Sequence, residues 1–481
     1  MDVPQKITDV ASAVRDAGGR ALLVGGCVRD ELMQQQPKDW DLEVYGVEPA
    51  GLRELLDQFG SVNVVGEAFT VYKLGAHLDV SLPRRERKTG RGHRAFFIEG
   101  DPGMTVEEAA SRRDFGINAI LLDPLNGEIV DPFHGRADIE KKILRAVAPD
   151  TFGEDSLRVL RAAQFAARFE FEIAPDTVEL CRSIDLSDLP SERIWGEIEK
   201  LLLRAQRPSI GLKWLRDLGA IDQLFSEIKA LIDVPQDPDW HPEGDVFVHT
   251  LLTVDRAREL IEDLPYPKQV TVMLAALCHD FGKPATTEFV DGRLRSRGHE
   301  EAGVEPTLSF LDKLNVHTLE GYDVRAQVVA LVRDHLKPGE YFKKRAEVGD
   351  GAFRRLARKC QLDLLYRVAK ADSFGRNAEW VAREKWYDAE AQEWFIARAR
   401  ELEVQEKAPP PLLLGRHLLE MGLEPGPRIG EITHAVYEMQ LDGRVGSLDE
   451  ARAAAKELLS ADYADYTERV RKNDNERPHR E

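Results

Sequence analysis

The chain has 481 residues, and 43% of them are hydrophobic, which allows two to four domains with sizeable cores. Its formal net charge of −19 disfavours non-specific binding to nucleic acid. No apolar run is long enough to span a membrane, the N-terminus shows no charged-then-apolar signal pattern, and the cysteines form no CxxC pair. We therefore expect a cytoplasmic protein without a disulfide framework or a cysteine zinc site.

Strand-like and helix-like segments alternate at the start of the chain, and helical patterns dominate afterwards. Periodicity predicts helices at 6–18, near 105–111 and from Glu154 to Arg168, and strands around 21–24, 40–46, 70–81 and 117–122. Proline-rich breaks occur at 232–244 and 407–411. We expect a mixed α/β domain at 1–150, followed by helical domains at 151–233, 234–405 and 406–481.

A glycine turn and a pair of acids lie close together near the N-terminus. Gly25 and Gly26 follow a short apolar strand, where glycine lets the backbone approach a ligand, and Arg29 lies just beyond them. Asp39 and Asp41 are two residues apart on an extended segment, so both point to one face. Mg²⁺ suits such a pair, because it shares oxygen ligands with substrate phosphates. This pattern indicates nucleotidyl transfer.

Another acid, Asp79, lies inside an apolar strand segment. A carboxylate in that position needs a partner. Two interpretations are open: Asp79 completes the metal site as a third acid, or it is hydrogen-bonded near the end of a strand.

Two arginines, Arg112 and Arg113, precede Asp114 and Asn118 at the entry to an apolar segment. Guanidinium forks suit phosphate oxygens, and Asp and Asn suit ribose hydroxyls. This stretch is therefore a candidate nucleotide contact.

Asp155, Arg158 and Arg161 recur every three residues, which places them on one helical face. Asp only accepts hydrogen bonds and Arg only donates them. Together they complement the amino donor and ring-nitrogen acceptor that cytosine and adenine share, and they mismatch uracil and guanine. One helical face is thus able to select C and A without a template; the alternative is an ordinary surface ion pair.

Four motifs before residue 230 together resemble those of the bacterial CCA-adding tRNA nucleotidyltransferases of the second class. These enzymes belong to the polymerase-β-like superfamily, as do bacterial poly(A) polymerases. The motifs are Gly25-Gly26-x-Val28-Arg29-Asp30, Asp39-Trp40-Asp41, Arg112-Arg113-Asp114-Phe115-x-Ile117-Asn118 and Glu154-Asp155-x-x-Arg158.

The resemblance implies an α/β nucleotidyltransferase head and a role for each motif. In the head, Asp39 and Asp41 would hold Mg²⁺, which orients the triphosphate and activates the RNA 3′-hydroxyl. The nucleotide contacts implied are Gly26 and Arg29 to the triphosphate, Arg113 to phosphate, Asp114 to ribose, Asp155 and Arg158 to the base, and Arg161 nearby. The basic stretch 84–94 matches the family's flexible loop, which is linked to the switch from C to A addition.

Two positions depart from the family pattern. Gln164 stands where the family commonly has an arginine that contacts the nucleotide, and Gly116 stands where threonine is common. Gln164 is able to form hydrogen bonds but brings no charge to phosphate, so the substitution bears on nucleotide affinity and on the balance of A and C.

Histidines and acids concentrate in the second half of the chain. The set comprises His249, the adjacent His279 and Asp280, and Asp372, with His299 and His335 nearby. Imidazole and carboxylate groups on neighbouring helices suit a divalent transition metal.

The spacing of this set resembles the HD phosphohydrolase superfamily over about 240–385. That resemblance implies His249, His279, Asp280 and Asp372 as metal ligands, with His299 and His335 where some members bind a second metal. Lys283 would steady a phosphate. Some CCA-adding enzymes carry such a domain, with phosphatase and 2′,3′-cyclic or 2′-phosphodiesterase activity. The metal would activate water for phosphoester hydrolysis.

The full expectation is an α/β head followed by an all-α neck, an HD domain and a tail that contacts tRNA. Its substrates would be tRNA, ATP and CTP, with no obligatory protein partner. A poly(A) polymerase and an A-only or CC-only adding enzyme are narrower alternatives. An HD hydrolase whose first half merely binds nucleotide or RNA is an alternative of another class.

Overall fold

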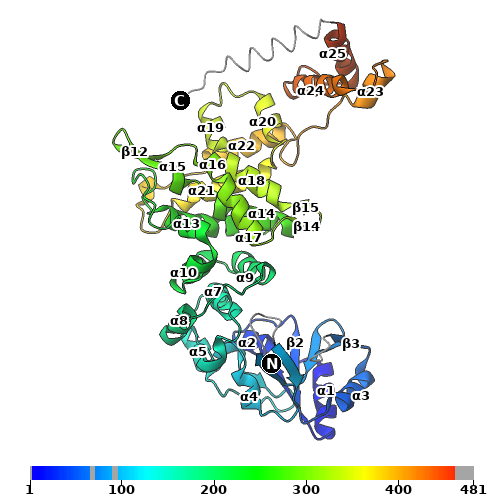
Figure 1. Cartoon of the computed structure of the whole chain (residues 1–481), viewed down its shortest axis with the longest axis vertical. Coiled ribbons are helices and arrows are strands. Elements are labelled where there is room, and N and C mark those ends of the chain that lie inside the picture. Colours follow the sequence, from blue (N-terminus) through cyan, green and yellow to red (C-terminus); the bar gives the residue numbers. More distant parts are fainter. Residues whose placement is uncertain (1–2, 66–70, 89–95, 461–481) are drawn as a thin grey trace.

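The structure, a computed structural model, describes residues 3–65, 71–88 and 96–460. Positions 89–94 of the basic stretch lie outside the described residues. The molecule is elongated, and the chain runs along its length in sequence order (Figure 1). A mixed sheet forms one end, helices form the middle, and a small helical tail forms the other end. The expected fold class is therefore confirmed.

The head is built on a seven-stranded mixed sheet with the order β3-β4-β5-β2-β1-β8-β9. Strands β2 and β5 are parallel, and the other neighbouring strands are antiparallel. The strands are β1 (Arg20–Val24), β2 (Trp40–Tyr45), β3 (Val62–Val65), β4 (Val71–Leu74), β5 (Leu78–Ser81), β8 (Leu121–Leu122) and β9 (Ile129–Val130).

Six α-helices belong to the described part of the head, and α1 illustrates why they form. Its apolar residues Ile7, Val10, Ala11 and Val14 recur on one face and are buried in the sheet's main core. The helices are α1 (Gln5–Asp16), α2 (Gly26–Leu32), α3 (Pro49–Leu56), α4 (Val106–Ser111), α5 (Gly135–Lys141) and α6 (Pro149–Phe152).

Three details of the head differ from the sequence predictions. The expected strand at 70–81 is two antiparallel strands, because Gly75 adopts a left-handed φ of +85° and turns the chain. The expected strand at 117–122 begins as a 3-10 helix, Gly116–Asn118, before the short β8. The described part of the basic stretch is not a loop, since β6 (Arg84–Lys88) pairs with β7 (Phe96–Gly100).

The first helix of the neck, α7 (Leu157–Phe169), begins three residues after the predicted helix start at Glu154, so Asp155 precedes the helix. A short parallel pair of β10 (Ile143–Leu144) and β11 (Glu172–Ile173) joins the head to the neck. The remaining neck helices are α8 (Pro175–Arg182), α9 (Ser191–Arg204), α10 (Pro208–Asp217), α11 (Ala220–Leu224) and α12 (Ser226–Lys229).

The middle of the molecule is a helical domain that shares one continuous hydrophobic core with the neck. The expected boundary at 233 therefore falls within that core. Its helices are α13 (Val246–Glu259), α14 (Tyr266–Cys278), α15 (Lys283–Thr286), α16 (His299–Ala302), α17 (Val304–Lys313), α18 (Val324–Asp334), α19 (Lys337–Lys343), α20 (Asp350–Leu356), α21 (Leu362–Gly375) and α22 (Glu390–Glu401). Two hairpins interrupt them, β12 (Thr287–Val290) with β13 (Arg293–Ser296) and β14 (Thr318–Leu319) with β15 (Tyr322–Asp323).

The tail comprises α23 (Gly415–Glu420), α24 (Pro427–Leu441) and α25 (Leu448–Ser460), and it has a small hydrophobic core of its own. Arg355 of α20 pairs with Glu438 of α24, at 2.7 Å, and with Asp442, the residue after that helix, at 2.6 Å. Throughout the described residues, every helix is too short or too polar to cross a membrane.

Candidate active sites

A cavity of about 870 Å³ lies between the head sheet and α7. Gly25 enters it with a left-handed φ of +72°, and a Cβ there would come within 2.9 Å of the Arg113 guanidinium. The predicted residues that line the cavity are Gly25, Gly26, Arg29, Asp41, Arg112, Arg113, Asp114, Asn118, Asp155, Arg158, Arg161 and Gln164.

The acidic wall of this cavity centres on Asp41. Removal of water by the surrounding protein raises the pKa of the Asp41 carboxyl; the positive charge of Arg113 opposes the rise. The negative charges of Asp79, Asp39 and Glu43 add to it. A carboxylate crowded by three others is a favourable place for a divalent cation, which prefers oxygen ligands.

The remaining acids have different surroundings. Asp39 is largely exposed, and its Oδ1 lies 3.1 Å from His77 Nδ1. Asp79 pairs with Lys73 Nζ at 3.1 Å and stands opposite Asp41 in the register of β2 and β5. Neither Asp39 nor Asp79 lines the cavity.

Glu43 lines the cavity but was missed from the sequence. Its Oε2 accepts the Tyr45 hydroxyl at 2.6 Å, and its Oε1 lies 3.7 Å from Arg113 Nη2. The sequence does carry a signal for Glu43, because this residue continues the two-residue spacing of Asp39 and Asp41 along one strand face.

A chain of buried hydrogen bonds links α2 to α7. Arg29 Nη1 donates to Asn118 Oδ1 at 2.6 Å, and Asn118 Nδ2 donates to Asp114 Oδ1 at 2.9 Å. Arg161 Nε donates to Asp114 Oδ2 at 2.8 Å. Burial alone would raise the pKa of Asp114, but the charge of Arg161 and these hydrogen bonds hold it below its usual value. Four predicted nucleotide contacts are thus preorganised by one another.

The predicted base-reading pair is held at the cavity wall by the protein itself. Arg158 donates to the carbonyl oxygens of Thr151, at 3.1 Å, and Arg112, at 2.7 Å. Asp155 accepts from Arg193 Nη2 at 3.0 Å. These contacts restrain both side chains before a nucleotide binds.

The Gln164 side chain is buried against the cavity, and its Nε2 has no hydrogen-bond partner among the described residues. Arg168, Lys200 and Arg204 line the same cavity and were not predicted. The Arg168 guanidinium lies 5.0 Å from the centre of the Phe169 ring. The sequence signal for these three residues is weak. Arg168 lies two helical turns beyond Arg161 on the same face of α7, but Lys200 and Arg204 lie on α9.

The second cluster lies in the middle domain, where side chains from separate helices converge. His249 Nε2 lies 3.0 Å from Asp372 Oδ1 and 3.3 Å from His279 Nε2. His299 Nε2 lies 3.3 Å from His335 Nε2. The six predicted ligands therefore form two groups, His249, His279 and Asp372 in one and Asp280, His299 and His335 in the other.

Asp280 lies between the two groups. Its Oδ2 is 3.2 Å from His279 Nε2, and its Oδ1 is 3.4 Å from His299 Nε2. The carboxylate is buried and forms an ion pair with Lys283, whose Nζ lies 2.7 Å from Oδ2. Neither oxygen has a partner of regular hydrogen-bond geometry among the described residues. Burial would raise the pKa of Asp280, but the charges of His279 and Lys283 keep it well below its usual value. This donor set fits two divalent ions that share Asp280.

The backbone at Gly282 lets the turn after Asp280 come close to α16. A Cβ on Gly282 would lie 2.0 Å from the His299 carbonyl oxygen, so the turn after Asp280 packs directly on α16. A cavity of about 190 Å³ opens beside the cluster and is lined by Asp280, Lys283, His299, His335 and Asp372. Arg376, which was not predicted, also lines it.

These two sites define a class of protein in which a nucleotidyltransferase head is joined to an HD-type metal domain. Comparison with known families agrees. Residues 21–145 match the Poly A polymerase head domain, 170–232 match a probable RNA- and SrmB-binding site of polymerase A, and 246–377 match the HD domain.

The chain is 38% identical over 365 residues to a multifunctional CCA protein of Haemophilus influenzae, covering 74% of this chain and 84% of that protein. It therefore belongs to the multifunctional CCA protein family. A CCA-adding enzyme solved with CTP has the same fold, with a TM-score of 0.61, 18% identity and coverage of 95% and 97%. So does a Thermotoga maritima CCA-adding enzyme complexed with tRNA, with a TM-score of 0.55, 18% identity and coverage of 95% and 96%.

Proposed function

We propose that the head and neck add CMP and AMP to the 3′ end of tRNA without a template. The single observation that carries the proposal is the cavity in which the glycine turn, the Asp41 carboxylate and the α7 arginines face one another. These groups supply what nucleotidyl transfer needs: backbone access and cations for a triphosphate, and a carboxylate for a metal. Membership of the multifunctional CCA protein family supports this proposal. The same membership disfavours a poly(A) polymerase.

Mg²⁺ is the ion that we propose for the head. The acids that would hold it are Asp39 and Asp41, with Asp79 as the third. Bound there, Mg²⁺ would neutralise charge that develops on the triphosphate. Arg113 and Arg29 would hold phosphate oxygens, and their places in the wall are set by Gly25 and Asn118.

Base selection would follow from Asp155 and Arg158. An acceptor beside a donor matches the edge that cytosine and adenine share. The restraint of both side chains by Arg193, Thr151 and Arg112 supports this role, because a fixed donor and acceptor discriminate better than mobile ones.

The RNA 3′ end would enter along the neck side of the cavity, beside Arg168, Lys200 and Arg204. Among the described residues, no ion pair joins Arg168 or Arg204 to a carboxylate, although the negative charge of Asp30 acts on Arg168 from farther away. Both cations line the cavity and are available to phosphates. Lys200 and Arg204 also fall within the segment that matches an RNA-binding family. The tail remains a predicted contact for the tRNA body.

For the middle domain we propose metal-dependent hydrolysis of phosphoesters at RNA ends, such as a 2′,3′-cyclic phosphate. A divalent transition metal on the histidine and aspartate groups would supply Lewis-acid chemistry. Lys283 and Arg376 face the same cavity and would orient the phosphate. Attack of water on phosphorus that breaks the bond to the 3′-oxygen would leave a 2′-phosphate and free the 3′-hydroxyl that the head extends. Because its substrates are tRNA and nucleotides, we expect the protein in the cytoplasm.

The test uses tRNA transcripts that lack CCA, CA or A, each incubated with CTP, ATP or both in Mg²⁺. We expect C on the first transcript, A on the third, and both in order when both nucleotides are present. Addition of A alone or of C alone would establish a narrower enzyme. Repeated A addition would establish a poly(A) polymerase. No incorporation on any transcript, together with tRNA binding, would leave the head as a binding module and contradict the proposal.

A further inference from the structure

Three of the four histidines in the hydrolytic cluster share one arrangement. In each, Nδ1 lies within hydrogen-bond distance of the backbone carbonyl oxygen three residues earlier. The pairs are His279 with Ala276 at 2.8 Å, His299 with Ser296 at 2.7 Å and His335 with Val332 at 2.7 Å. A carbonyl oxygen only accepts, so Nδ1 carries the proton and Nε2 keeps its lone pair for a metal.

Each of these three histidines lies at a helix terminus, where such a carbonyl is available. His279 and His335 follow the last residues of α14 and α18, and His299 is the first residue of α16. The last carbonyl groups of α14 and α18 have no partner within their helices. The carbonyl beside His299 belongs to Ser296, the last residue of β13, which lies outside α16.

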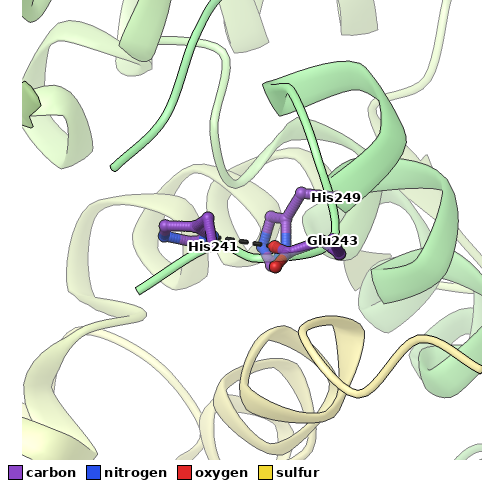
Figure 2. Close-up of side chains that lie close together, drawn as sticks. All are labelled: His241, Glu243 and His249. Atoms are coloured by element: carbon purple, nitrogen blue, oxygen red, sulfur yellow. Dashed lines mark hydrogen bonds and ion pairs between the residues drawn. The ribbon is translucent and has the colours of Figure 1, made fainter. Parts of the chain in front are cut away.

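His249 is different because it lies inside the first turns of α13. The carbonyl three residues earlier, that of Val246, already accepts the Thr250 hydroxyl at 2.8 Å. Instead, His249 Nδ1 lies 2.7 Å from Glu243 Oε1 in an ion-pair contact (Figure 2), and it has no partner of regular hydrogen-bond geometry among the described residues. Glu243 precedes the helix and is almost completely buried.

We propose that Glu243 is a positioning residue, which fixes His249 as the Nδ1–H tautomer and aims its Nε2 at the hydrolytic metal. This inference rests on the metal site proposed above. A carboxylate partner also makes the imidazole a stronger donor to a metal than a carbonyl partner does. Glu243 thus supplies at a helix interior what the backbone supplies to the other three histidines.

The same Glu243 oxygen lies 2.8 Å from His241 Nδ1, so one oxygen serves two imidazoles (Figure 2). The alternative is a separate ion held by His241, Glu243 and His249, whose ligand atoms lie close enough together. That arrangement would require His249 to give both ring nitrogens to cations and to lose both protons. The direct contact of His249 with Glu243 requires neither.

The experiment measures Co²⁺ binding to the full chain by equilibrium dialysis and by the visible absorption of the bound ion. Ions bound by the wild type but lost in Asp280→Asn belong to the hydrolytic site. For these ions we expect Glu243→Leu to weaken binding about 10–100-fold. Glu243→Gln, which keeps an acceptor but no charge, should lie at the lower end of that range. Glu301→Gln, an exposed acid of the same domain, is the matched control and should bind as the wild type does.

The outcomes separate the two claims. If Asp280→Asn binds as many ions as the wild type, the proposed metal site fails. If Asp280→Asn loses ions but both Glu243 variants keep wild-type affinity, the positioning role is wrong. Loss of one whole ion from Glu243→Gln with unchanged affinity for the rest would identify a separate ion site and also overturn it. Urea unfolding of each variant identifies loss of fold, and Glu243→Gln decides the question if Glu243→Leu does not fold.

Discussion

Asp41 and Asp79 stand opposite each other on the parallel strands β2 and β5, and the negative charge of Asp79 helps to raise the pKa of Asp41. The two residues are far apart in sequence. Parallel pairing therefore makes a single acidic group from two separate segments. Lys73, at 3.1 Å from Asp79, offsets part of that charge.

We predict that Asp79→Asn lowers the rate of nucleotidyl transfer about 10²–10³-fold, because it removes one charge that would hold a metal against the triphosphate. The measurement is CMP incorporation into tRNA without CCA over a range of Mg²⁺ concentrations. Lys73→Met is the control, since it removes the ion pair and keeps the acid. Equal rates for Asp79→Asn and wild type would show that Asp79 merely pairs with Lys73.

The Asp114–Arg161 pair predicts a dependence of stability on pH. Asp114 has a folded-state pKa below its unfolded value of about 3.9, so its contribution is complete above that pH and is lost as the pH falls through the folded pKa. Arg161→Met should lower the free energy of unfolding by about 3 kcal/mol at neutral pH, with the loss shrinking towards acid pH as Asp114 is protonated.

Urea unfolding of wild type and Arg161→Met between neutral and acid pH measures this loss. Arg15→Met, which removes an exposed partner of Asp16, is the control and should cost little at any pH. A loss for Arg161→Met that does not change with pH would contradict the coupling to Asp114.

Arg168 and Arg204, which line the neck side of the cavity, predict a defect in RNA binding when either is replaced. Arg168→Gln and Arg204→Gln should each weaken tRNA binding, and each should lower the slope of log affinity against log salt by about 0.7–0.9 per lost phosphate contact. The KM for CTP should stay close to the wild-type value for Arg204→Gln, whose side chain is exposed. Filter binding at several salt concentrations measures both quantities, with Arg53→Gln on α3 as the control. An unchanged slope for both variants would show that the RNA does not contact the side of the cavity lined by Arg168 and Arg204.

The grouping around Asp280 predicts two hydrolytic ions. Burial, and after it the nearby His299 and His279, lower the pKa of His335 to about 3, so its imidazole is neutral at pH 7, as a metal ligand requires. His335→Gln should reduce the ions that depend on Asp280 from about two to about one. Equilibrium dialysis counts them, and His317→Gln, an exposed histidine of the same domain, is the control. An unchanged count would show that His335 holds none of these ions and would contradict the second ion site.

The sequence predicts candidate groups that the structure brings together, because motifs such as Arg112-Arg113-Asp114 and His279-Asp280 place them within a few residues. It also predicts the change from an α/β head to helices. It does not predict which groups become partners across the fold. The Lys73 contact of Asp79 depends on the strand turn at Gly75, and the contact of Glu243 with His249 depends on the entry angle of α13.

Other features escape prediction for similar reasons. The β12–β13 hairpin has mixed polar and apolar residues with no core behind much of it, so its pattern is weak. The composition does not reveal that the neck and the middle domain share one core. The proline-rich segment 232–244 between them suggests a domain boundary instead. Arg204 and Arg168 come together only because α7 and α9 pack against each other.

The most direct test of two independent sites on one chain uses reciprocal variants in two assays. Nucleotidyl transfer is measured on tRNA that lacks CCA, and hydrolysis is measured on an RNA that ends in a 2′,3′-cyclic phosphate. We predict that Asp41→Asn abolishes transfer and keeps hydrolysis, whereas Asp280→Asn abolishes hydrolysis and keeps transfer. Loss of both activities in either variant, with the urea unfolding of the wild type retained, would show that the two sites are not independent.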